Sequence, residues 1–298
     1  MARPDLLDPA TLASLGGIEI VARWIVDGFL TGLHRSPRKG FSVEFAEHRP
    51  YQSGDDLRYI DWKIAARLDR WVVKQYEEET NLRATIVLDV SRSMDWSGAP
   101  TRLTKLAYAE RLCAALALLF LRQHDAVGLI RFDDRVRTSV PPRSRSRHWR
   151  RLVAALDDPG AARATHAPEA LEAAGRLISR RGMIVLVSDL LLDPEPVLAV
   201  LRGMRRAGHQ VTVLHVMDPA ERELPQAADA IFVDPESGDE IPATVADVRA
   251  AYRATVAEAI AEWRTALTSI GAAYEVVETD APFGVPLRRA FALRQRLA

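Results

Sequence analysis

The chain has 298 residues, of which 48% are hydrophobic, so it can bury a substantial core and is not predominantly disordered. Its 40 Lys and Arg residues balance its 40 Asp and Glu residues, which excludes a strong overall attraction to nucleic acid or to an anionic membrane. Cys113 is the only cysteine, which excludes an internal disulfide and a zinc site built on several thiolates.

No membrane-spanning or secretion segment is predicted. The longest wholly apolar run, residues 112–121, has ten residues, about half of the roughly 20 that a helix needs to cross a bilayer. The first five residues do not begin a positively charged region followed by an apolar stretch. We therefore expect a cytoplasmic protein.

Residues 1–80 are predicted to form an N-terminal appendage. A helix is expected over residues 9–33, interrupted by two glycines, and a strand over residues 71–76. Between them, residues 41–70 carry charged side chains interspersed with aromatic ones. Because the aromatic side chains need burial and charges of opposite sign can pair, we expect the appendage to be docked on the rest of the chain.

Residues 81–298 alternate between short apolar runs and longer stretches of helical period, a pattern typical of βαβ units. The apolar runs are almost continuous, as in strands that helices cover on both faces. The expected strands are residues 84–90, 126–132, 183–188, 211–216 and 274–277. The expected helices are residues 101–123, 147–156, 168–180, 194–207 and 244–270.

These elements predict an α/β domain whose mostly parallel central sheet has about six strands, with helices on both faces and a C-terminal tail. Residues 136–140 are expected to form one antiparallel edge strand. The link before them, Asp133 to Arg135, is too short for a crossover connection. We expect Asp133 and Asp134 to form a solvated hairpin tip.

Oxygen-bearing side chains follow several of the predicted strands. Because ligands of open parallel sheets gather at the carboxyl ends of the strands, these side chains are expected to face one crevice. Three hydroxyls and two carboxylates supply only oxygen ligands, which suits Mg²⁺ or Mn²⁺ and excludes a site for a soft metal. The candidate ligands are Asp89, Ser91 and Ser93 after the first strand, Thr165 before a helix, and Asp189 after a later strand.

The Asp89-x-Ser91-x-Ser93 turn, with Thr165 and Asp189 at matching places, resembles the metal-ion-dependent adhesion site of von Willebrand factor A domains. This resemblance implies a von Willebrand factor A-like fold. It also implies that Ser91, Ser93 and Thr165 would be hydroxyl ligands. Asp89 and Asp189 would bind the cation directly or through water.

A second motif, which ends before the first strand of the sheet, is similar to that of the bacterial domain-of-unknown-function fifty-eight family. It is Arg49-x-Tyr51-x-x-Gly54-Asp55-Asp56-x-Arg58-x-Ile60-Asp61-Trp62-x-x-Ala65-Ala66-Arg67. This resemblance implies a partner of MoxR-type AAA+ ATPases that acts in assembly, maturation or metal insertion of client proteins. From the residues alone, the motif is interpreted as an ion-paired network that docks the appendage, or alternatively as a second ligand site.

The combined expectation is a non-catalytic, metal-dependent protein-binding module. Neutral hydroxyl ligands withdraw little charge from the cation, so an acidic side chain of a partner protein can complete its coordination. The chain contains no G-x-x-x-x-G-K-[ST] phosphate loop, so it is not expected to hydrolyse ATP itself. The G-x-G-x-x-G dinucleotide fingerprint is also absent.

Two other functions stay open at this point. A metal-dependent hydrolase would use the same cation with His166 as the base. A nucleic-acid adaptor would use residues 135–151, which hold seven arginines and His148 and can neutralise phosphates. A solvated surface is the alternative interpretation of this segment, because Trp149 is its only aromatic residue.

Overall fold

The structure is a computed structural model, and it describes residues 9, 17–34, 48–50, 71–74, 82–158, 167–224, 229–233 and 240–288. The chain divides into two units, one made of residues 1–32 and 82–298 and the other of residues 33–81. Most of the charged and aromatic segment at 41–70 lies outside the described residues. The predicted docking of the appendage therefore stays a prediction.

A six-stranded sheet forms the centre of the larger unit, in the order β10-β7-β6-β3-β4-β5. All neighbouring strands are parallel except β4 and β5, which are antiparallel. The predicted mostly parallel sheet with one antiparallel edge strand is therefore confirmed. The strands are β3 (Arg83–Asp89), β4 (Ala126–Phe132), β5 (Val136–Arg143), β6 (Met183–Ser188), β7 (Gln210–Met217) and β10 (Ala273–Glu278).

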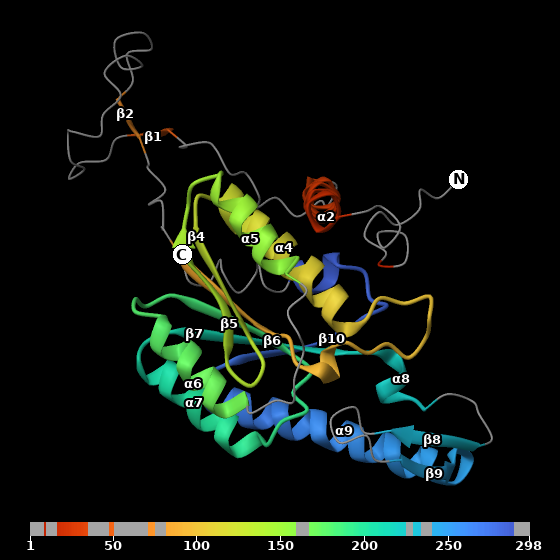
Figure 1. Cartoon of the computed structure of the whole chain (residues 1–298). Helices are drawn as coiled ribbons and strands as arrows, with labels where there is room; N and C mark the ends of the chain where they lie inside the picture. The colour runs from red at the N-terminus through yellow and green to blue at the C-terminus, as the bar shows by residue number, and fades with distance from the viewer. Residues whose placement is uncertain are drawn as a thin grey trace, which may run out of the picture. The chain divides into compact units, whose positions relative to one another are not determined.

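Helices cover both faces of this sheet, as Figure 1 shows. On one face, α4 packs on β3 and β4 and contacts α5. On the other face, α6 packs on β4 and β5, α7 packs on β7, and α9 packs on β10. Every residue of β6 is buried, which explains why its sequence is continuously apolar up to its terminal serine. The helices are α4 (Lys105–Arg122), α5 (His148–Leu156), α6 (Ala167–Leu177), α7 (Pro194–Arg206) and α9 (Val245–Ser269).

Helix α4 is the most deeply buried helix around the sheet among the described residues, and Cys113 lies in it fully buried. The helix begins at Lys105, four residues after the predicted start at position 101. Thr104 sets this start, because its hydroxyl accepts the backbone N–H of Ala107 at 3.1 Å and caps the helix. Helix α2 (Ile18–His34) lies near the other end of α4, where Arg122 pairs with Asp27 at 2.7 Å.

Several short elements were not predicted from the sequence. In the larger unit, β8 (Asp229–Val233) and β9 (Glu240–Thr244) form an antiparallel pair, and α8 (Pro219–Arg222) is a single turn after β7. In the smaller unit, β1 (His48–Pro50) was also not predicted. It pairs with β2 (Val72–Lys74), which lies within the strand predicted at 71–76.

Gly182, directly before β6, illustrates a close approach of two backbones. Gly208 and Gly271 have positive φ angles of 87° and 72° and end helices in the left-handed conformation. Gly182 has no positive φ angle, although its position after a helix favours a left-handed helix end in the sequence. A Cβ atom at Gly182 would lie 2.1 Å from the carbonyl oxygen of Arg83. The residue therefore lets the start of β6 lie against the start of β3.

None of the helices in the described part of the chain has both the length and the apolar character needed to cross a membrane.

Candidate metal site at the carboxyl edge of the sheet

Asp89 ends strand β3 and is fully buried at the carboxyl edge of the sheet. Its Oδ1 accepts the backbone N–H of Ser91 at 2.9 Å, and its Oδ2 accepts the hydroxyl of Ser188 at 2.7 Å. Because Ser188 ends β6, which pairs directly with β3, the two hydrogen bonds fix the carboxylate between neighbouring strand ends.

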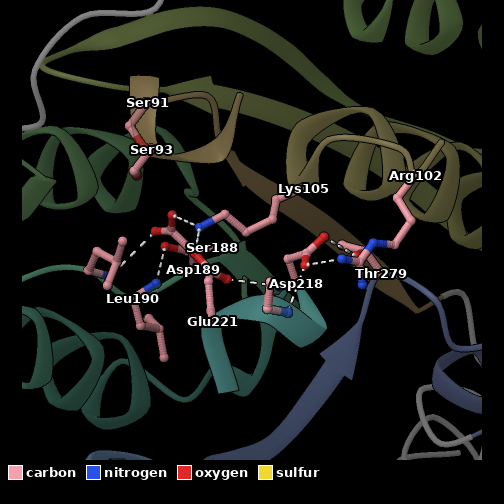
Figure 2. Close-up of polar contacts among 12 residues, drawn as sticks. Ser91, Ser93, Arg102, Lys105, Ser188, Asp189, Leu190, Asp218, Glu221 and Thr279 are labelled. Atoms are coloured by element: carbon pink, nitrogen blue, oxygen red, sulfur yellow. Dashed lines mark hydrogen bonds and ion pairs between the residues drawn. The ribbon is translucent and has the colours of Figure 1, made fainter. Parts of the chain in front are cut away.

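Ser91 and Ser93 follow Asp89 in a turn that continues into the 3-10 helix η2 (Arg92–Met94). Both serines are buried, and their hydroxyl oxygens lie 3.1 Å apart. Figure 2 shows the two side chains together, above Asp189 and the ammonium group of Lys105. The structure thus brings four of the five predicted ligands, Asp89, Ser91, Ser93 and Asp189, to one edge of the sheet.

Asp189 lies in a strained turn directly after β6. The next residue, Leu190, has a φ angle of 52°, a left-handed conformation that leucine rarely adopts. Its backbone N–H donates to the Ser188 hydroxyl at 3.0 Å, and the N–H of Leu191 donates to Asp189 Oδ1 at 3.3 Å. Strained residues of this kind are concentrated at functional sites.

Lys105 is a member of the site that the sequence does not predict. Its Nζ donates to Asp189 Oδ2 at 2.8 Å and also to Oε1 of Glu221. The Nζ atom lies 5.9 Å from the ring centre of Trp96. The Lys105 side chain is only 1% exposed, so this ammonium is a buried positive charge shared by two carboxylates.

Glu221 connects this ion pair to helix α8. Its Oε2 accepts the backbone N–H of Asp218 at 2.8 Å, which completes the capping box of the helix. Asp218 is itself paired with Arg102 at 3.2 Å, and it accepts the Thr279 hydroxyl at 3.2 Å. Arg102 therefore neutralises the charge of Asp218, while Lys105 is shared by Asp189 and Glu221 (Figure 2).

Burial dominates the electrostatics of the site. Burial and, to a smaller extent, the nearby charge of Asp189 together raise the pKa of Asp89 to about 7, against the opposing effect of hydrogen bonds from Ser188 and Ser91. Burial also lowers the pKa of His215 to about 4, and its Nδ1 hydrogen-bonds the Tyr274 hydroxyl at 2.7 Å. The site is therefore rich in buried acidic groups, while its histidine is neutral near pH 7.

The donor atoms fit a hard divalent cation. In an octahedral shell with Mg²⁺ to oxygen distances of about 2.0–2.1 Å, adjacent ligands lie roughly 2.8–3.0 Å apart. The separation of 3.1 Å between the Ser91 and Ser93 oxygens is close to that value. In the described residues, no three His, Cys, Asp or Glu side chains form a metal-binding group. A cation would therefore rely on the two serine hydroxyls besides Asp89 and Asp189.

Some predicted residues lie outside the described part of the chain. They include Thr165, the remaining predicted ligand, and His166, the candidate base of the hydrolase interpretation. Of the motif that runs from Arg49 to Arg67, only Arg49 and the next residue, in strand β1, are described. The roles predicted for these residues therefore stay predictions.

The arginine-rich segment runs along β5 into the start of α5. It begins at the carboxyl edge, where Val136 pairs with Phe132, and its part from Arg143 onward lies at the opposite edge, where Arg143 pairs with Val127. Five of its arginines are exposed and form no ion pair with another described residue: Arg143, Arg145, Arg147, Arg150 and Arg151. Trp149 is 5% exposed, so its ring is not available for base stacking. Asp133 is fully buried and Arg137 Nε binds both of its carboxylate oxygens at 2.6 Å, so the prediction of a solvated tip is wrong for Asp133.

Two signals in the sequence point to the residues that were missed. Lysine occurs at only four positions in this arginine-rich chain, and Lys105 is one of them. Glu221 belongs to an Asp-Pro-x-Glu capping-box pattern directly after an apolar strand, at the same edge of the sheet as Asp89 and Asp189. Neither signal indicates that the two residues contact each other.

The family described as Protein of unknown function DUF58 matches residues 47–262 of the chain. Among curated proteins, an uncharacterized protein of Mycobacterium tuberculosis and one of Mycobacterium bovis are each 33% identical to it over 243 residues. These matches cover 80% of this chain and 75% of each relative.

Two solved structures are similar at lower identity. One is an aerotolerance-related membrane protein from Bacteroides fragilis, with a TM-score of 0.47 and 20% identity over 70% of this chain and 96% of that one. The other is the conserved hypothetical protein BatB from Bacteroides thetaiotaomicron, with a TM-score of 0.47 and 18% identity over 72% of this chain and 99% of that one.

Proposed function

The chain belongs to the DUF58 family, and from that premise we propose that it is a non-catalytic protein-binding module that depends on a divalent cation. The cation, Mg²⁺ or Mn²⁺, would be held by Asp89, Ser91, Ser93 and Asp189 together with Thr165. When bound, it would present an open coordination position to an acidic side chain of a partner protein.

One observation carries this proposal. Two buried serine hydroxyls lie 3.1 Å apart, beside two buried carboxylates that come from neighbouring strands of a parallel sheet. Hydroxyl ligands leave most of the charge of a cation uncompensated. A further carboxylate from a partner is therefore favoured at such a site.

The finer assignments belong to the same proposal. The fold would be von Willebrand factor A-like, and its cation site would be a metal-ion-dependent adhesion site. The partner would be a MoxR-type AAA+ ATPase in the cytoplasm, or a client protein that this ATPase helps to assemble, mature or load with metal. The support for these points is the resemblance of the sequence motifs together with the observed arrangement of the strand ends.

A binding titration with a purified MoxR-type ATPase tests the proposal. Wild type is expected to bind in Mg²⁺ and to lose most of its affinity in EDTA. Asp189→Ala and Ser91→Ala are expected to bind weakly under both conditions. Ser97→Ala is the matched control, because among the described residues the Ser97 hydroxyl hydrogen-bonds only the carbonyl oxygen of Ala99, so the substitution should leave binding unchanged. Equal affinities of wild type and Asp189→Ala in both buffers would contradict the proposal.

A nucleic-acid adaptor is the second candidate, and the five exposed arginines between residues 143 and 151 favour it. The two functions differ in how they respond to solution conditions. Binding through arginine and phosphate contacts falls steeply with added salt but is insensitive to EDTA. Replacing Arg143, Arg145 and Arg147 with Gln would weaken it. The same replacement is expected to leave EDTA-sensitive binding to the ATPase unchanged.

A further inference from the structure

The ammonium group of Lys105 binds a buried carboxylate that would also bind the proposed cation. Its Nζ donates to Asp189 Oδ2 at 2.8 Å, and Asp189 is one of the proposed ligands. The side chains of Lys105 and Asp189 are 1% and 2% exposed, so water screens this pair little. The second acceptor of the ammonium is Glu221, whose side chain is 19% exposed.

With all its carboxylates ionised, the site carries a net negative charge. Asp89, Asp189 and Glu221 then contribute three carboxylates and Lys105 contributes one ammonium, so the formal charge is −3 plus 1, or −2, and a proton on Asp89, whose pKa is raised to about 7, would reduce it. The adjacent Asp218 is excluded from this sum, because Arg102 neutralises it. One divalent cation would bring the formal charge of the site to zero.

Lys105 and a divalent cation compete for Asp189. Two positive groups on the same buried carboxylate repel each other strongly, because the interior screens charges poorly. The chain provides Lys105 with a second acceptor, Glu221, which already accepts a hydrogen bond from it. Lys105 can therefore give up Asp189 without becoming an unpaired buried charge, which would be costly.

Glu221 is held in place by contacts that do not involve Lys105. Its Oε2 accepts the N–H of Asp218 at 2.8 Å, and its carbonyl oxygen accepts the Tyr252 hydroxyl of helix α9 at 2.9 Å. At the other end of the ion pair, the backbone N–H of Lys105 donates to the Trp96 carbonyl at 2.9 Å and fixes the start of α4. The lysine side chain is thus the movable part between two fixed carboxylates.

From this arrangement we propose that Lys105 is an internal counter-ion of the site, which stays on Glu221 but leaves Asp189 when a divalent cation binds. Lys105 then lowers the affinity for the cation and keeps the cation-free site from carrying its full negative charge. The inference rests on the proposed function, because it concerns the same site. It assigns roles to Lys105 and Glu221, which the resemblance to adhesion sites does not cover.

Mn²⁺ binding to the full chain, measured by electron paramagnetic resonance, tests this role. In Lys105→Met a neutral side chain of similar length replaces the competing charge, so Mn²⁺ is expected to bind about tenfold more tightly than to wild type, or better. In Glu221→Gln the ammonium has only Asp189 as a charged acceptor, so Mn²⁺ is expected to bind about threefold to tenfold more weakly. The two variants therefore shift the affinity in opposite directions.

Arg131→Met is the matched control for the loss of a buried cation. Arg131 is 2% exposed and hydrogen-bonds Glu110 and two backbone carbonyls away from the proposed ligands. Like Lys105→Met, this variant is expected to lose stability, because it leaves buried partners unpaired, but it should bind Mn²⁺ like wild type. A thermal melt of each variant with and without Mn²⁺ gives a second readout, in which Lys105→Met should gain more stability from the ion than wild type.

The outcomes separate the inference from the proposed function. If wild type binds Mn²⁺ and Asp189→Ala does not, but Lys105→Met binds no more tightly than wild type, the role of Lys105 is wrong and the cation site stands. If neither wild type nor Lys105→Met binds Mn²⁺, both are wrong. Binding by Lys105→Met alone would support the inference. If Lys105→Met does not fold, unchanged or tighter binding by Glu221→Gln contradicts the inference.

Discussion

At the scale of single residues, Ser188 connects the Asp89 carboxylate to the turn that carries Asp189. Its hydroxyl donates to Asp89 at 2.7 Å and accepts the N–H of Leu190, the residue that follows Asp189, at 3.0 Å. Ser188→Ala leaves both partners buried without this hydrogen bond, so we expect it to lower the free energy of unfolding by about 1–3 kcal/mol. Urea denaturation in EDTA measures the change.

Ser97→Ala is the control for that measurement. The Ser97 hydroxyl is half-buried in a turn and, within the described part of the chain, donates only to the carbonyl oxygen of Ala99. We expect its removal to change stability by less than about 0.5 kcal/mol. A loss of the same size in both variants would show that the Ser188 hydroxyl has no special role.

His215 makes stability depend on pH in a defined window. Burial lowers its pKa to about 4 in the folded protein, whereas an unfolded histidine has a pKa of about 6.5. Between these values the unfolded chain binds more protons than the folded one, so the stability from His215 is complete above pH 6.5 and is lost as pH falls toward 4. The maximal slope is about 1.4 kcal/mol for each pH unit.

Replacing His215 with Gln tests this pH effect. The variant should be less stable than wild type at pH 7, because the contact with the Tyr274 hydroxyl is altered. Between pH 4.5 and 6.5, its free energy of unfolding should fall by less than that of wild type. His148 and His209, whose pKa values burial also lowers, add slopes of the same sign in both proteins, and Asp89, whose pKa is raised to about 7, adds a slope of the opposite sign in both. Parallel pH profiles for the two proteins would contradict the assignment.

The residues of the site differ in how far sequence reasoning can find them. Asp89, Ser91 and Ser93 form one short motif, so their proximity follows from the local turn. Lys105 lies 84 positions before Asp189 and 116 positions before Glu221, and only the packing of α4 against the sheet brings them together. No local pattern in the sequence indicates that contact.

At the scale of elements, burial decides which segments the sequence predicts well. Strands β3, β4 and β6 begin and end within one residue of their predicted limits, because each is apolar on both faces. The pair β8 and β9 was missed, and Pro242 lies inside the second strand, where a proline argues against a strand in the sequence. Helix α8 has four residues, too few to show a helical period.

Two glycines give opposite predictions for substitution by alanine. At Gly182 a Cβ would lie 2.1 Å from a backbone oxygen, which cannot move without displacing β3. We expect Gly182→Ala to lower the free energy of unfolding by about 1–3 kcal/mol or more. Gly203, inside α7, has no atom near its Cβ position, so Gly203→Ala should raise it by about 0.5–1 kcal/mol. Similar melting temperatures for the two variants would contradict the assigned close contact.

At the scale of the whole molecule, the strand order explains why distant parts of the chain form one site. Strand β3 lies next to β6, and β6 next to β7, so their carboxyl ends place Asp89, Asp189 and the start of α8 side by side. Although the net charge of the chain is zero, the structure contains two separate regions of opposite charge. One is the buried acidic group at this edge, and the other is the exposed arginine segment at 143–151.

If the acidic region binds a cation, and a partner carboxylate completes the coordination of that cation, then cation and partner must raise each other's binding affinity by the same factor. Thermodynamic linkage requires the partner to tighten Mn²⁺ binding by the same factor by which Mn²⁺ tightens partner binding. We expect a factor of about 10 to 100, which is common for such coupling. Mn²⁺ affinity is measured with and without a saturating MoxR-type ATPase, and ATPase affinity with and without Mn²⁺. In Asp189→Ala the factor should fall to about one. A factor of one in wild type would mean that the partner does not contact the cation, even if both bind the protein.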